Sequence, residues 1–246
     1  MNHINYAWQL LESKSFSYDD LARTDLISLI QEHPGRCLEL GCHAGKTGEV
    51  IKEKFDNVHY TGVEINPHTS AIAKSRLDKV ITDELSATEL VAHPDCQRPF
   101  DTIIAADVLE HLYNPWSYLE QFQSLLTPQG KIYLSIPNSR NYWLIEQLIC
   151  GHWSYESAGL LDITHIRFFT LTECLKMFHQ TGYQVLRCES VADSRIHFNG
   201  DFHASTDTHG KHFSLHNVDA EMLKELSTLQ FLFVIAKNNP MVVNDD

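Results

Sequence analysis

The stretch RCLELGCHAGKTGEVIKEKFDNVHYTGVE, residues 36–64, carries the strongest structural signal in the chain. A short apolar run ends in a turn that contains Gly41 and Gly45, a helical pattern follows, and a second apolar run ends at Glu64. Such a unit binds the polar part of a nucleoside cofactor against the turn and the ribose against the terminal acid. Glu64 lies 23 positions after Gly41, near the roughly 20 expected for a ribose-binding acid. The stretch therefore predicts a nucleoside-cofactor site.

Two phosphate-binding motifs compete for this turn, and both fail at defined positions. The dinucleotide pattern G-x-G-x-x-G requires glycine where this chain has His43 and Lys46. A P-loop requires four residues between its first glycine and its Gly-Lys-Thr triplet. In this chain only three residues separate Gly41 from the triplet that begins at Gly45. The run FDTIIAAD, ending at Asp107, would suit a magnesium-binding strand. A nucleotide triphosphatase therefore stays an alternative that the short loop disfavours.

The turn is similar to a third motif. Glu39-Leu40-Gly41-Cys42-His43-Ala44-Gly45 resembles the first motif of class I S-adenosylmethionine-dependent methyltransferases, an acid followed by x-G-x-G-x-G. The resemblance implies cofactor contacts at Glu39, Gly41, Cys42, His43 and Gly45. His43 replaces the family's middle glycine, which lets the backbone lie close to the cofactor. We expect its side chain to turn outward, since only some glycine positions need a positive φ. A weakened or repurposed cofactor site is the alternative.

Further motifs follow in the family's order. In TGVEIN, the resemblance implies that Glu64 holds the ribose hydroxyls, with Ile65 beside it in the cofactor site. Asp83 would meet the adenine amino group, although an acid after a strand can also cap the next helix. In FDTIIAADVLEHLYNP, Asp107 and its neighbour Val108 would border the methionine moiety, although Asp107 could equally stabilise a turn. These matches imply S-adenosyl-L-methionine as the cofactor.

Two later blocks extend the resemblance. LLTPQGKIYLSIPN matches the family's helix end, glycine turn and fifth strand. LDITHIRFFTLTECLKMFHQTGYQV, residues 161–185, resembles a block of one subgroup in which D-x-x-H-x-R-F-F-T precedes a helix and the sixth strand. YDDLARTDLISLI, residues 18–30, resembles that subgroup's lead-in. The motifs occur in the right order over residues 18 to about 192, which makes the combination specific.

Strand and helix patterns alternate along the chain. Apolar runs predict strands near 36–41, 58–63, 78–82, 100–106, 130–136, 183–191 and 228–236. Helical patterns lie near 5–33, 45–54, 67–76, 86–92, 115–126, 171–181 and 217–227. This alternation predicts a Rossmann-like α/β fold with three layers, α/β/α, around a mostly parallel seven-stranded sheet. The first of these helical stretches is expected to cover the cofactor side.

A length of 246 residues suits one α/β domain. Residues 139–169 are rich in aromatic side chains and break the alternation, so we expect a cap over the acceptor site. We predict a single methyltransferase domain over residues 1–240, divided into N-terminal helices (1–34), a cofactor-binding half (36–136), a cap with the sixth strand (137–192), and a loop, helix and last strand (193–240). Residues 241–246 are expected to form a flexible tail.

Bulk properties limit the partners. The net charge of −13 disfavours general nucleic-acid binding, which relies on Lys and Arg at phosphates. Apolar runs such as YWLIEQLIC are shorter than the roughly 20 residues of a membrane span, and the start of the chain has no secretory pattern. The six cysteines form no C-x-x-C pair and are interpreted as reduced, buried thiols. We therefore expect a cytoplasmic protein, monomeric or homodimeric.

Methyl transfer to an alcohol or phenol requires a base near the methyl group, at the carboxyl edge of the sheet. His165 is the first candidate, because the resembling subgroup also has histidine there. An unperturbed imidazole pKa near 6.5 suits proton removal at neutral pH. Asp162 could orient the ring. The alternative is a structural hydrogen bond by which His165 pins the cap.

His111 is the second catalytic candidate. It follows Asp107 by four positions, so the two would share one face of a helical turn. The alternative is a structural contact with the loop after the fifth strand. Glu110 is interpreted as a solvated or capping carboxylate, with an acid catalyst as the alternative. Arg167 is interpreted as a structural ion-pair partner, with a clamp for an acceptor carboxylate as the alternative.

Residues 197–216 contain a histidine-rich segment with five histidines (197, 203, 209, 212, 216), Asp201 and Asp207. Clustered imidazoles and carboxylates can bind zinc or another divalent cation. Their spacing matches no ordered template such as H-E-x-x-H. We interpret the segment as a polar loop that could set acceptor specificity, and predict no metal site.

The sequence thus predicts an S-adenosylmethionine-dependent methyltransferase that transfers methyl to oxygen on a small-molecule or glycan acceptor. Nitrogen as the acceptor atom is the nearest alternative. A non-catalytic module that only binds the cofactor is another alternative, because His43 stands where the family has glycine. The identity of the acceptor lies beyond the sequence.

Overall fold

Seven strands form the central sheet, and the predicted cofactor unit lies within it. The computed structural model describes residues 20–196, 206–209 and 213–238. The strands are β1 (Arg36–Leu40), β2 (His59–Val63), β3 (Lys79–Ile81), β4 (Phe100–Ala106), β5 (Leu126–Pro137), β6 (Tyr183–Ala192) and β9 (Thr228–Lys237). Their order is β3-β2-β1-β4-β5-β9-β6, in which β9 pairs antiparallel with both neighbours and the other pairs are parallel. The predicted sheet is confirmed.

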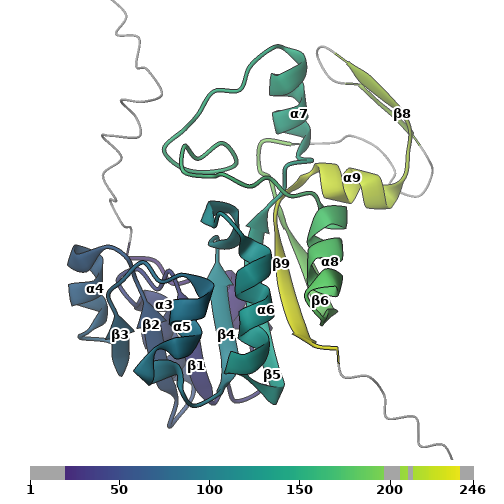
Figure 1. Ribbon diagram of the computed structural model, residues 1–246. Helices are drawn as coiled ribbons and strands as arrows, with labels where there is room; N and C mark the ends of the chain where they lie inside the picture. Colours follow the sequence, from purple (N-terminus) through teal and green to yellow (C-terminus); the bar gives the residue numbers. More distant parts are fainter. Residues whose placement is uncertain (1–19, 197–205, 210–212, 239–246) are drawn as a thin grey trace, which may run out of the picture.

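Helices cover both faces of the sheet, which gives the three predicted layers (Figure 1). One face carries α2 (Thr24–Leu29), α3 (Lys46–Lys54) and α4 (Pro67–Ala73), and the other carries α5 (Ala87–Ala92), α6 (Pro115–Leu125) and α8 (Leu171–Gln180). Short 3-10 helices, Pro94–Cys96 and Leu109–His111, follow α5 and β4. Pro67 and Pro115 occupy first helical positions, where a missing N–H leaves no bond unmade.

The central strands are apolar on both faces, because both faces are covered. On β1, Leu38 and Leu40 pack in the core beneath α5, α6 and α8, whereas Cys37 packs in the core beneath α2, α3 and α4. On β4, the neighbours Ile103 and Ile104 are buried in these two cores in the same way. This double burial explains the continuous apolar runs of the sequence.

Helix α3 approaches β2 closely, and Gly48 makes that approach possible. A Cβ atom at Gly48 would lie 2.5 Å from Cδ2 of Leu77 and 2.7 Å from Cε1 of Tyr60. The Tyr60 ring is fully buried, and its hydroxyl donates a 2.9 Å hydrogen bond to Glu39, so the ring has little freedom to move aside. The backbone of α3 at Gly48 therefore packs directly against the ring of Tyr60.

A cap lies beyond the carboxyl ends of the parallel strands (Figure 1). The predicted cap segment, residues 139–169, contains α7 (Tyr142–Ile149) and a long irregular stretch. The same end of the molecule holds a two-stranded hairpin, β7 (Thr206–His209) with β8 (Ser214–Val218), and α9 (Ala220–Leu226). These elements together place side chains over the sheet edge where ligands of open α/β folds bind.

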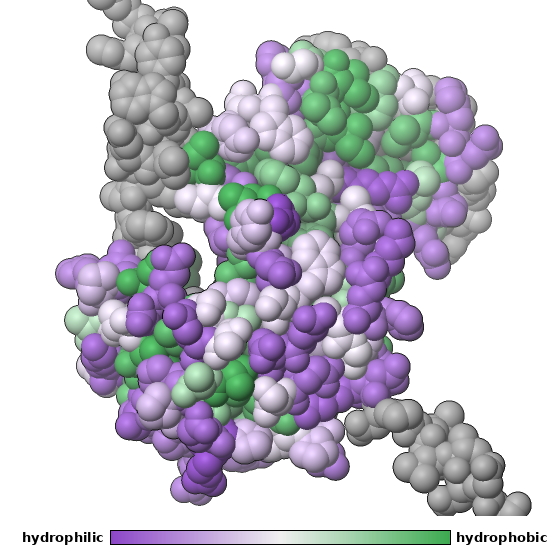
Figure 2. Space-filling view, in the orientation of Figure 1, coloured by the Kyte–Doolittle hydropathy of each residue, from purple (hydrophilic) through white to green (hydrophobic). Residues whose placement is uncertain are grey.

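The cap has a small core of its own. Tyr142 of α7 packs with Val218 of β8 and with Leu223 and Leu226 of α9. Outside this core, Leu148 and Ile149 at the end of α7 are at least half exposed, and Figure 2 shows hydrophobic surface over α7. The cap is therefore a packed unit with an apolar outer side.

Several predicted elements need correction. The helical pattern of residues 5–33 yields, within the described residues, a helix confined to Thr24–Leu29; residues 5–19 lie outside the described ranges. The segment interpreted as a loop contains the β7–β8 hairpin, and the helix expected at 217–227 begins at Ala220. Strand β8 was not predicted because Val218 is its only buried residue. Its other residues are mostly polar, so the strand lacks the apolar alternation that indicates a strand.

The helices and the cysteines can be compared with the sequence predictions. None of the helices in the described ranges has the length and apolar character needed to cross a membrane. All six cysteines are free, and Cys37, Cys42, Cys96 and Cys174 are buried as predicted. Cys188 is exposed, which corrects the prediction of uniformly buried thiols, since β6 is the edge strand of the sheet.

Replacing Gly48 by alanine tests the close packing of α3. Alanine would gain about 1 kcal/mol of helix propensity, but the added methyl group would overpack against Tyr60 and Leu77 at a cost of about 1–3 kcal/mol. We expect Gly48→Ala to lower the free energy of unfolding in urea denaturation. Glu53→Ala, at an exposed position of the same helix, is the control and should change stability by less than about 0.5 kcal/mol. A stabilised Gly48→Ala variant would contradict this packing.

Candidate cofactor and acceptor site

The turn after β1 is shaped by positive φ angles and by one carboxylate. The φ angles of Gly41, His43 and Gly45 are 65°, 59° and 79°. The backbone N–H of His43 donates to Oε2 of Glu64 at 2.9 Å, and the N–H of Asn66 donates to Oε1 at 2.8 Å. The buried carboxylate of Glu64 thus ties the turn after β1 to the turn after β2.

These residues fit an adenosyl cofactor. Each oxygen of Glu64 keeps a second lone pair for a ribose hydroxyl after accepting one backbone N–H. The next residue, Ile65, is 56% exposed although it is a large apolar side chain beside a buried acid. An exposed apolar face there suits the face of a base. At Gly41 a Cβ atom would lie 3.1 Å from Cγ2 of Val108, so the turn has little room for a side chain.

Glu39 and Tyr60 form a buried polar pair beneath the turn. The Tyr60 hydroxyl donates to Oε2 of Glu39 at 2.9 Å, and both residues are almost inaccessible. Burial raises the pKa of the Glu39 carboxyl to about 8, even though the hydrogen bond from Tyr60 and the charge of Arg23 favour ionisation. Glu39 therefore lies below the cofactor turn, where it supports the turn from within the core.

His43 corrects one expectation about the turn. The sequence predicts a position that does without a positive φ, but His43 adopts a φ of 59°. The turn needs this conformation because the His43 N–H is directed at Glu64. A left-handed conformation costs a non-glycine residue about 1–2 kcal/mol. The side chain is half-buried, and burial lowers its pKa to about 4, so the imidazole is neutral at physiological pH.

Arg76 supports the same turn and was missed by sequence reasoning. Its guanidinium donates to the carbonyl of Ala44 at 2.9 Å and pairs with Asp20 at 2.5 Å. Arg76 follows α4, and nothing in its sequence position indicates contact with the turn. The contact arises because α4 packs beside α3 on the same face of the sheet.

Asp107, at the carboxyl end of β4, is held by two residues from distant segments. Ser135 of β5 donates to Oδ1 of Asp107 at 2.6 Å, and Arg23 donates to Oδ2 at 2.6 Å. The φ of Asp107 is 53°, and its N–H donates to Oγ of Ser135. Arg23 lies in the predicted lead-in motif, but it is 84 residues away from Asp107, so no local pattern indicates this ion pair.

Asp83 does not cap the following helix. The cap of α5 is Ser86, which forms a capping box with Glu89. Asp83 is exposed near the end of β3, and its Oδ1 accepts from the N–H of Glu84 at 2.8 Å. The interpretation as a helix cap is wrong, and the predicted contact with adenine stays a prediction.

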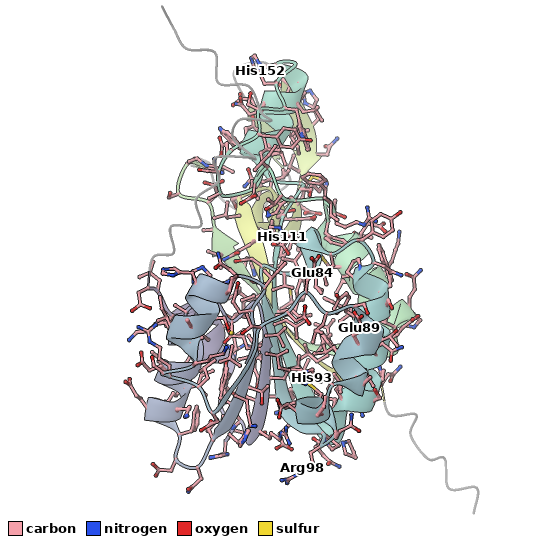
Figure 3. The ribbon with its side chains drawn as sticks, turned by 60° about the vertical axis from the view of Figure 1, so that its left-hand side comes forward. Glu84, Glu89, His93, Arg98, His111 and His152 are labelled. Carbon is pink, nitrogen blue, oxygen red and sulfur yellow. The ribbon has the colours of Figure 1, made fainter. Side chains whose placement is uncertain are left out.

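A cavity of about 230 Å³ lies between this edge of the sheet and the cap. Its lining includes Asp107, Glu110 and His111 from the end of β4, and Asp162 and His165 from the cap. Asp107 therefore borders both the predicted cofactor edge and the cavity. Figure 3 shows His111 between the sheet and the cap.

Both predicted catalytic histidines lie in this cavity. The His111 and His165 rings are 4.7 Å apart between centroids and meet edge to face. Nδ1 of His165 lies 3.3 Å from the carbonyl of Leu160. Since a carbonyl only accepts, Nδ1 carries the proton in the neutral ring and Nε2 presents the lone pair. The carbonyl of Leu160 thus orients this ring, and Asp162 accepts from the N–H and the hydroxyl of Thr164.

Charge and burial keep His165 neutral. Burial lowers the pKa of His165, and the neighbouring His111 lowers it further. A neutral imidazole can accept a proton, so the ring is in the form that base catalysis requires. The structural alternative is also realised, because the bond to Leu160 pins the ring to the cap. Arg167 donates to the carbonyl of Tyr113 and lies over its ring, so the predicted ion pair is replaced by these contacts.

Glu110 was misjudged from the sequence. It is 1% exposed, whereas a solvated or capping carboxylate was expected. Neither carboxylate oxygen has a hydrogen-bond partner among the described residues. Burial raises the pKa of Glu110 well above its ordinary value, and the charge of Asp107 adds to the effect. The cap covers Glu110 and removes it from solvent, which a sequence pattern cannot show.

The histidine-rich segment remains a separate question. His197, Asp201, His203 and His212 lie outside the described residues. The side chains of Asp207 and His209 are not described either. The interpretation of residues 197–216 as a specificity loop therefore stays a prediction.

A family model of a methyltransferase domain matches residues 17–187. The chain belongs to this methyltransferase family. A ubiquinone biosynthesis O-methyltransferase of Aeromonas salmonicida (strain A449) is 23% identical over 154 residues, 61% of this chain and 63% of that protein. A trans-aconitate 2-methyltransferase of Methylobacterium nodulans is 27% identical over 121 residues, 49% of this chain and 43% of that protein. Both matches span less than two thirds of the relative's own length.

A solved structure agrees with the fold of this methyltransferase. A SAM-dependent methyltransferase from Archaeoglobus fulgidus superposes with a TM-score of 0.62 at 20% identity, over 95% of this chain and 100% of that chain. The Rossmann-like fold is thereby confirmed. Family membership confirms the predicted methyltransferase class. The subgroup suggested by the cap motif stays a prediction.

Replacing His43 by glycine tests the strain in the methyltransferase's turn. Glycine removes the cost of the left-handed conformation, about 1–2 kcal/mol, but adds about 0.5–1 kcal/mol of chain entropy to the unfolded state. We expect His43→Gly to raise the free energy of unfolding by about 0.5–1 kcal/mol. Gly45→Ala is the opposite control and should destabilise, because its Cβ would lie 3.1 Å from Cα of Ala73 at a φ of 79°. A destabilised His43→Gly variant would show that contacts of the imidazole outweigh strain.

The pH dependence of stability tests the buried Glu39. Its pKa of about 8 in the folded methyltransferase exceeds the 4.5 of an ordinary Glu, so the folded state keeps a proton that the unfolded chain loses. The free energy of unfolding should therefore fall as pH rises from 4.5 to 8. Glu39→Gln keeps an acceptor for Tyr60 and should show a smaller fall between pH 5.5 and 8 in urea denaturation.

Glu32→Gln provides the control for this comparison. Glu32 is exposed and paired with Lys131, which lowers its pKa, so it does not titrate between pH 5.5 and 8. Its removal should leave the fall in stability unchanged. Equal pH dependence in wild type and Glu39→Gln would mean that Glu39 is ionised in the folded protein.

Proposed function

We propose that this chain methylates an oxygen atom of a small-molecule or glycan acceptor, with S-adenosylmethionine as the methyl donor. The single observation that carries the proposal is the cavity beside Asp107, which is lined by two imidazoles in edge-to-face contact under a cap. Its position at the carboxyl edge of the sheet is where open α/β folds bind ligands. The arrangement therefore combines a predicted cofactor turn with a partly open cavity for the acceptor.

The chain's own residues would hold the cofactor along the sheet edge. Glu64 would accept the ribose hydroxyls, and the exposed Ile65 would pack on the base. Asp107 and the turn at Gly41 would border the methionine part, with Asp83 at the adenine end. The bound cofactor supplies an activated methyl group on a sulfonium, so the protein mainly aligns the reactants and excludes water.

His165 would remove the proton of the acceptor hydroxyl. Its Nδ1 proton is engaged by Leu160, which leaves Nε2 as the basic atom of the ring. The lowered pKa keeps this nitrogen unprotonated at neutral pH. His111 packs against the ring and would keep its orientation. The cap, which covers both histidines, would keep water away from the transferred methyl group.

The size of the cavity favours a small acceptor or one unit of a larger one. About 230 Å³ is below the roughly 300–1,000 Å³ of sites for drug-sized ligands. The ring of Phe168 contacts His165 on one side and Trp153 on the other. Phe168 and Trp153 are both partly exposed. Such rings could stack on a sugar or an aromatic extension of the acceptor. The relative named as an O-methyltransferase supports oxygen as the acceptor atom.

Binding of S-adenosylhomocysteine tests the cofactor part of the proposal. We expect calorimetric titration to show one binding site per chain and to raise the melting temperature. His165→Asn should retain this affinity while transfer of a radiolabelled methyl group to a hydroxyl-bearing acceptor panel falls at least tenfold, since the base contributes about 10²-fold or more. Asparagine keeps a donor for the Leu160 carbonyl, so the cap should stay folded.

Three outcomes would count against the proposal. Failure of S-adenosylhomocysteine to bind or to protect the folded protein would remove the cofactor. Unchanged methyl transfer in His165→Asn would remove His165 as the base. Methylation of amines but not of hydroxyls in the panel would establish nitrogen as the acceptor atom.

A further inference from the structure

Three metal-ligating side chains meet at the wall of the acceptor cavity. Glu110, His111 and His165 each offer one ligand atom, and these atoms lie within 4.8 Å of one another. Nε2 of His165 is 3.8 Å from Oε1 of Glu110. Atoms that share one cation at about 2.1 Å lie roughly 3–4 Å apart, depending on the bond angle. Side-chain shifts of about 1 Å or less would therefore close this cluster around a cation.

Glu110 is the least satisfied polar group of the cluster. Both its oxygens are buried without a hydrogen-bond partner among the described residues, and the residue is 1% exposed. A buried polar group without a partner keeps the full cost of its desolvation, and the cost is larger when the group is charged. Buried carboxylates are therefore paired, hydrogen-bonded or bound to metals in most proteins. No cationic side chain forms an ion pair with Glu110 in the described ranges apart from the contact with His165.

The two imidazoles are oriented as metal ligands are. Nδ1 of His165 faces the carbonyl of Leu160 at 3.3 Å. Nδ1 of His111 faces the carbonyl of Thr164 at 3.2 Å and its hydroxyl oxygen at 3.1 Å, and that hydroxyl donates its own proton to Asp162. A carbonyl acceptor at Nδ1 fixes the tautomer in which Nε2 is the basic nitrogen. Metal-binding histidines carry such a bond at the second nitrogen, which sets the orientation of the ring.

The backbone holds the three residues together. The carbonyl of Glu110 accepts two 3.0 Å hydrogen bonds, from the N–H groups of Ile166 and Arg167. The end of β4 is thereby joined to the cap segment that contains His165. Asp107 and Asp162 line the same cavity and add negative charge near the cluster. The carboxylate of Asp107 already accepts from Arg23 and Ser135, so it is not counted as a ligand.

We propose that Glu110, His111 and His165 bind one divalent transition-metal cation whose remaining coordination positions face the acceptor cavity. Two imidazoles and one carboxylate form a donor set that suits first-row ions such as Mn²⁺, Fe²⁺, Co²⁺ and Zn²⁺. Three protein ligands leave positions open for oxygen atoms of a bound molecule. The cation in the cavity wall would then bind the acceptor directly.

The cation would define the acceptor class, a part of the inference that rests on the proposed function. An acceptor with two neighbouring oxygens, such as a catechol or an α-hydroxy acid, would chelate the open positions. A cation lowers the pKa of a hydroxyl that it binds, so the hydroxyl proton would pass to bulk water. In the cation-bound site His165 serves as a ligand, which replaces its role as the base in the proposed function, and the cation activates the acceptor oxygen.

Cobalt binding tests the site directly. We would treat the full chain with a chelator, remove the chelator, and titrate Co²⁺ by calorimetry and by visible absorption. The expected result is one tight equivalent per chain in the wild type and an affinity at least tenfold lower in Glu110→Gln. Gln fills the same space, and the Glu110 oxygens have no donor to lose, so this variant should fold. His111→Asn is the second variant, and each protein is checked for melting and for S-adenosylhomocysteine affinity.

The histidine-rich segment supplies the matched control. A His197→Asn, His203→Asn double variant should retain the wild-type Co²⁺ affinity within twofold. Absence of Co²⁺ binding by folded wild-type protein would overturn the proposal. Loss of the tight equivalent in the double variant with retention in Glu110→Gln would overturn it as well. Co²⁺ binding that depends on Glu110 in a protein without S-adenosylhomocysteine affinity would support the metal site while the proposed function fails.

The acceptor class has its own test. Addition of a catechol should shift the visible absorption of the Co²⁺ protein, whereas a monohydroxy phenol of similar size should shift it less. The shift should disappear in Glu110→Gln at matched protein and Co²⁺ concentrations. Equal responses to the catechol and the monophenol would overturn chelation as the basis of recognition.

Discussion

The carboxylate of Glu64 holds the turn after β1, where the adenosyl cofactor is predicted to bind. It accepts one N–H from the turn after β1 and one from the turn after β2, so two crossover connections share a single buried carboxyl group. Buried carboxylates are stable when backbone donors satisfy them, and here two donors do so. The left-handed conformation of His43 follows from this bond, because the peptide must turn its N–H inward.

A second charge network links the start of the described chain to the centre of the sheet. Arg23 pairs with Asp107 and also donates to Ser135, while its own backbone N–H donates to Thr47 of α3. The segment before α2 is therefore fastened across the ends of β4 and β5. This half-buried pair gives Asp107 a fixed position between the cofactor edge and the cavity.

The site gathers features that would be costly elsewhere. His43 and Asp107 both have positive φ angles, and the carboxyls of Glu39 and Glu110 are buried with raised pKa values. Strained conformations and perturbed carboxyls persist only where surrounding structure holds them in place, and they concentrate at functional sites. These polar and strained residues gather at one edge of the sheet. The two faces of the sheet are left to the apolar cores.

The sequence by itself determined the sheet, the layers and the cofactor turn. Alternating apolar runs and helical patterns are local properties, and a glycine turn followed by Glu64 at a fixed spacing is confined to one crossover unit. His111 and His165 could be named as site residues because each lies in a recognisable motif. Their meeting in one cavity, however, depends on how the cap folds back over β4.

Only the tertiary structure decided the burial and the partners of the charged groups. Arg23 and Arg76 reach the site across 84 and 32 residues of chain, and no local pattern encodes such contacts. Glu110 has the sequence surroundings of an exposed acid, but the cap removes it from water and brings His165 against it. Periodicity reports which face of an element is apolar, whereas the environment of a carboxylate is set by segments that pack on it from elsewhere in the chain.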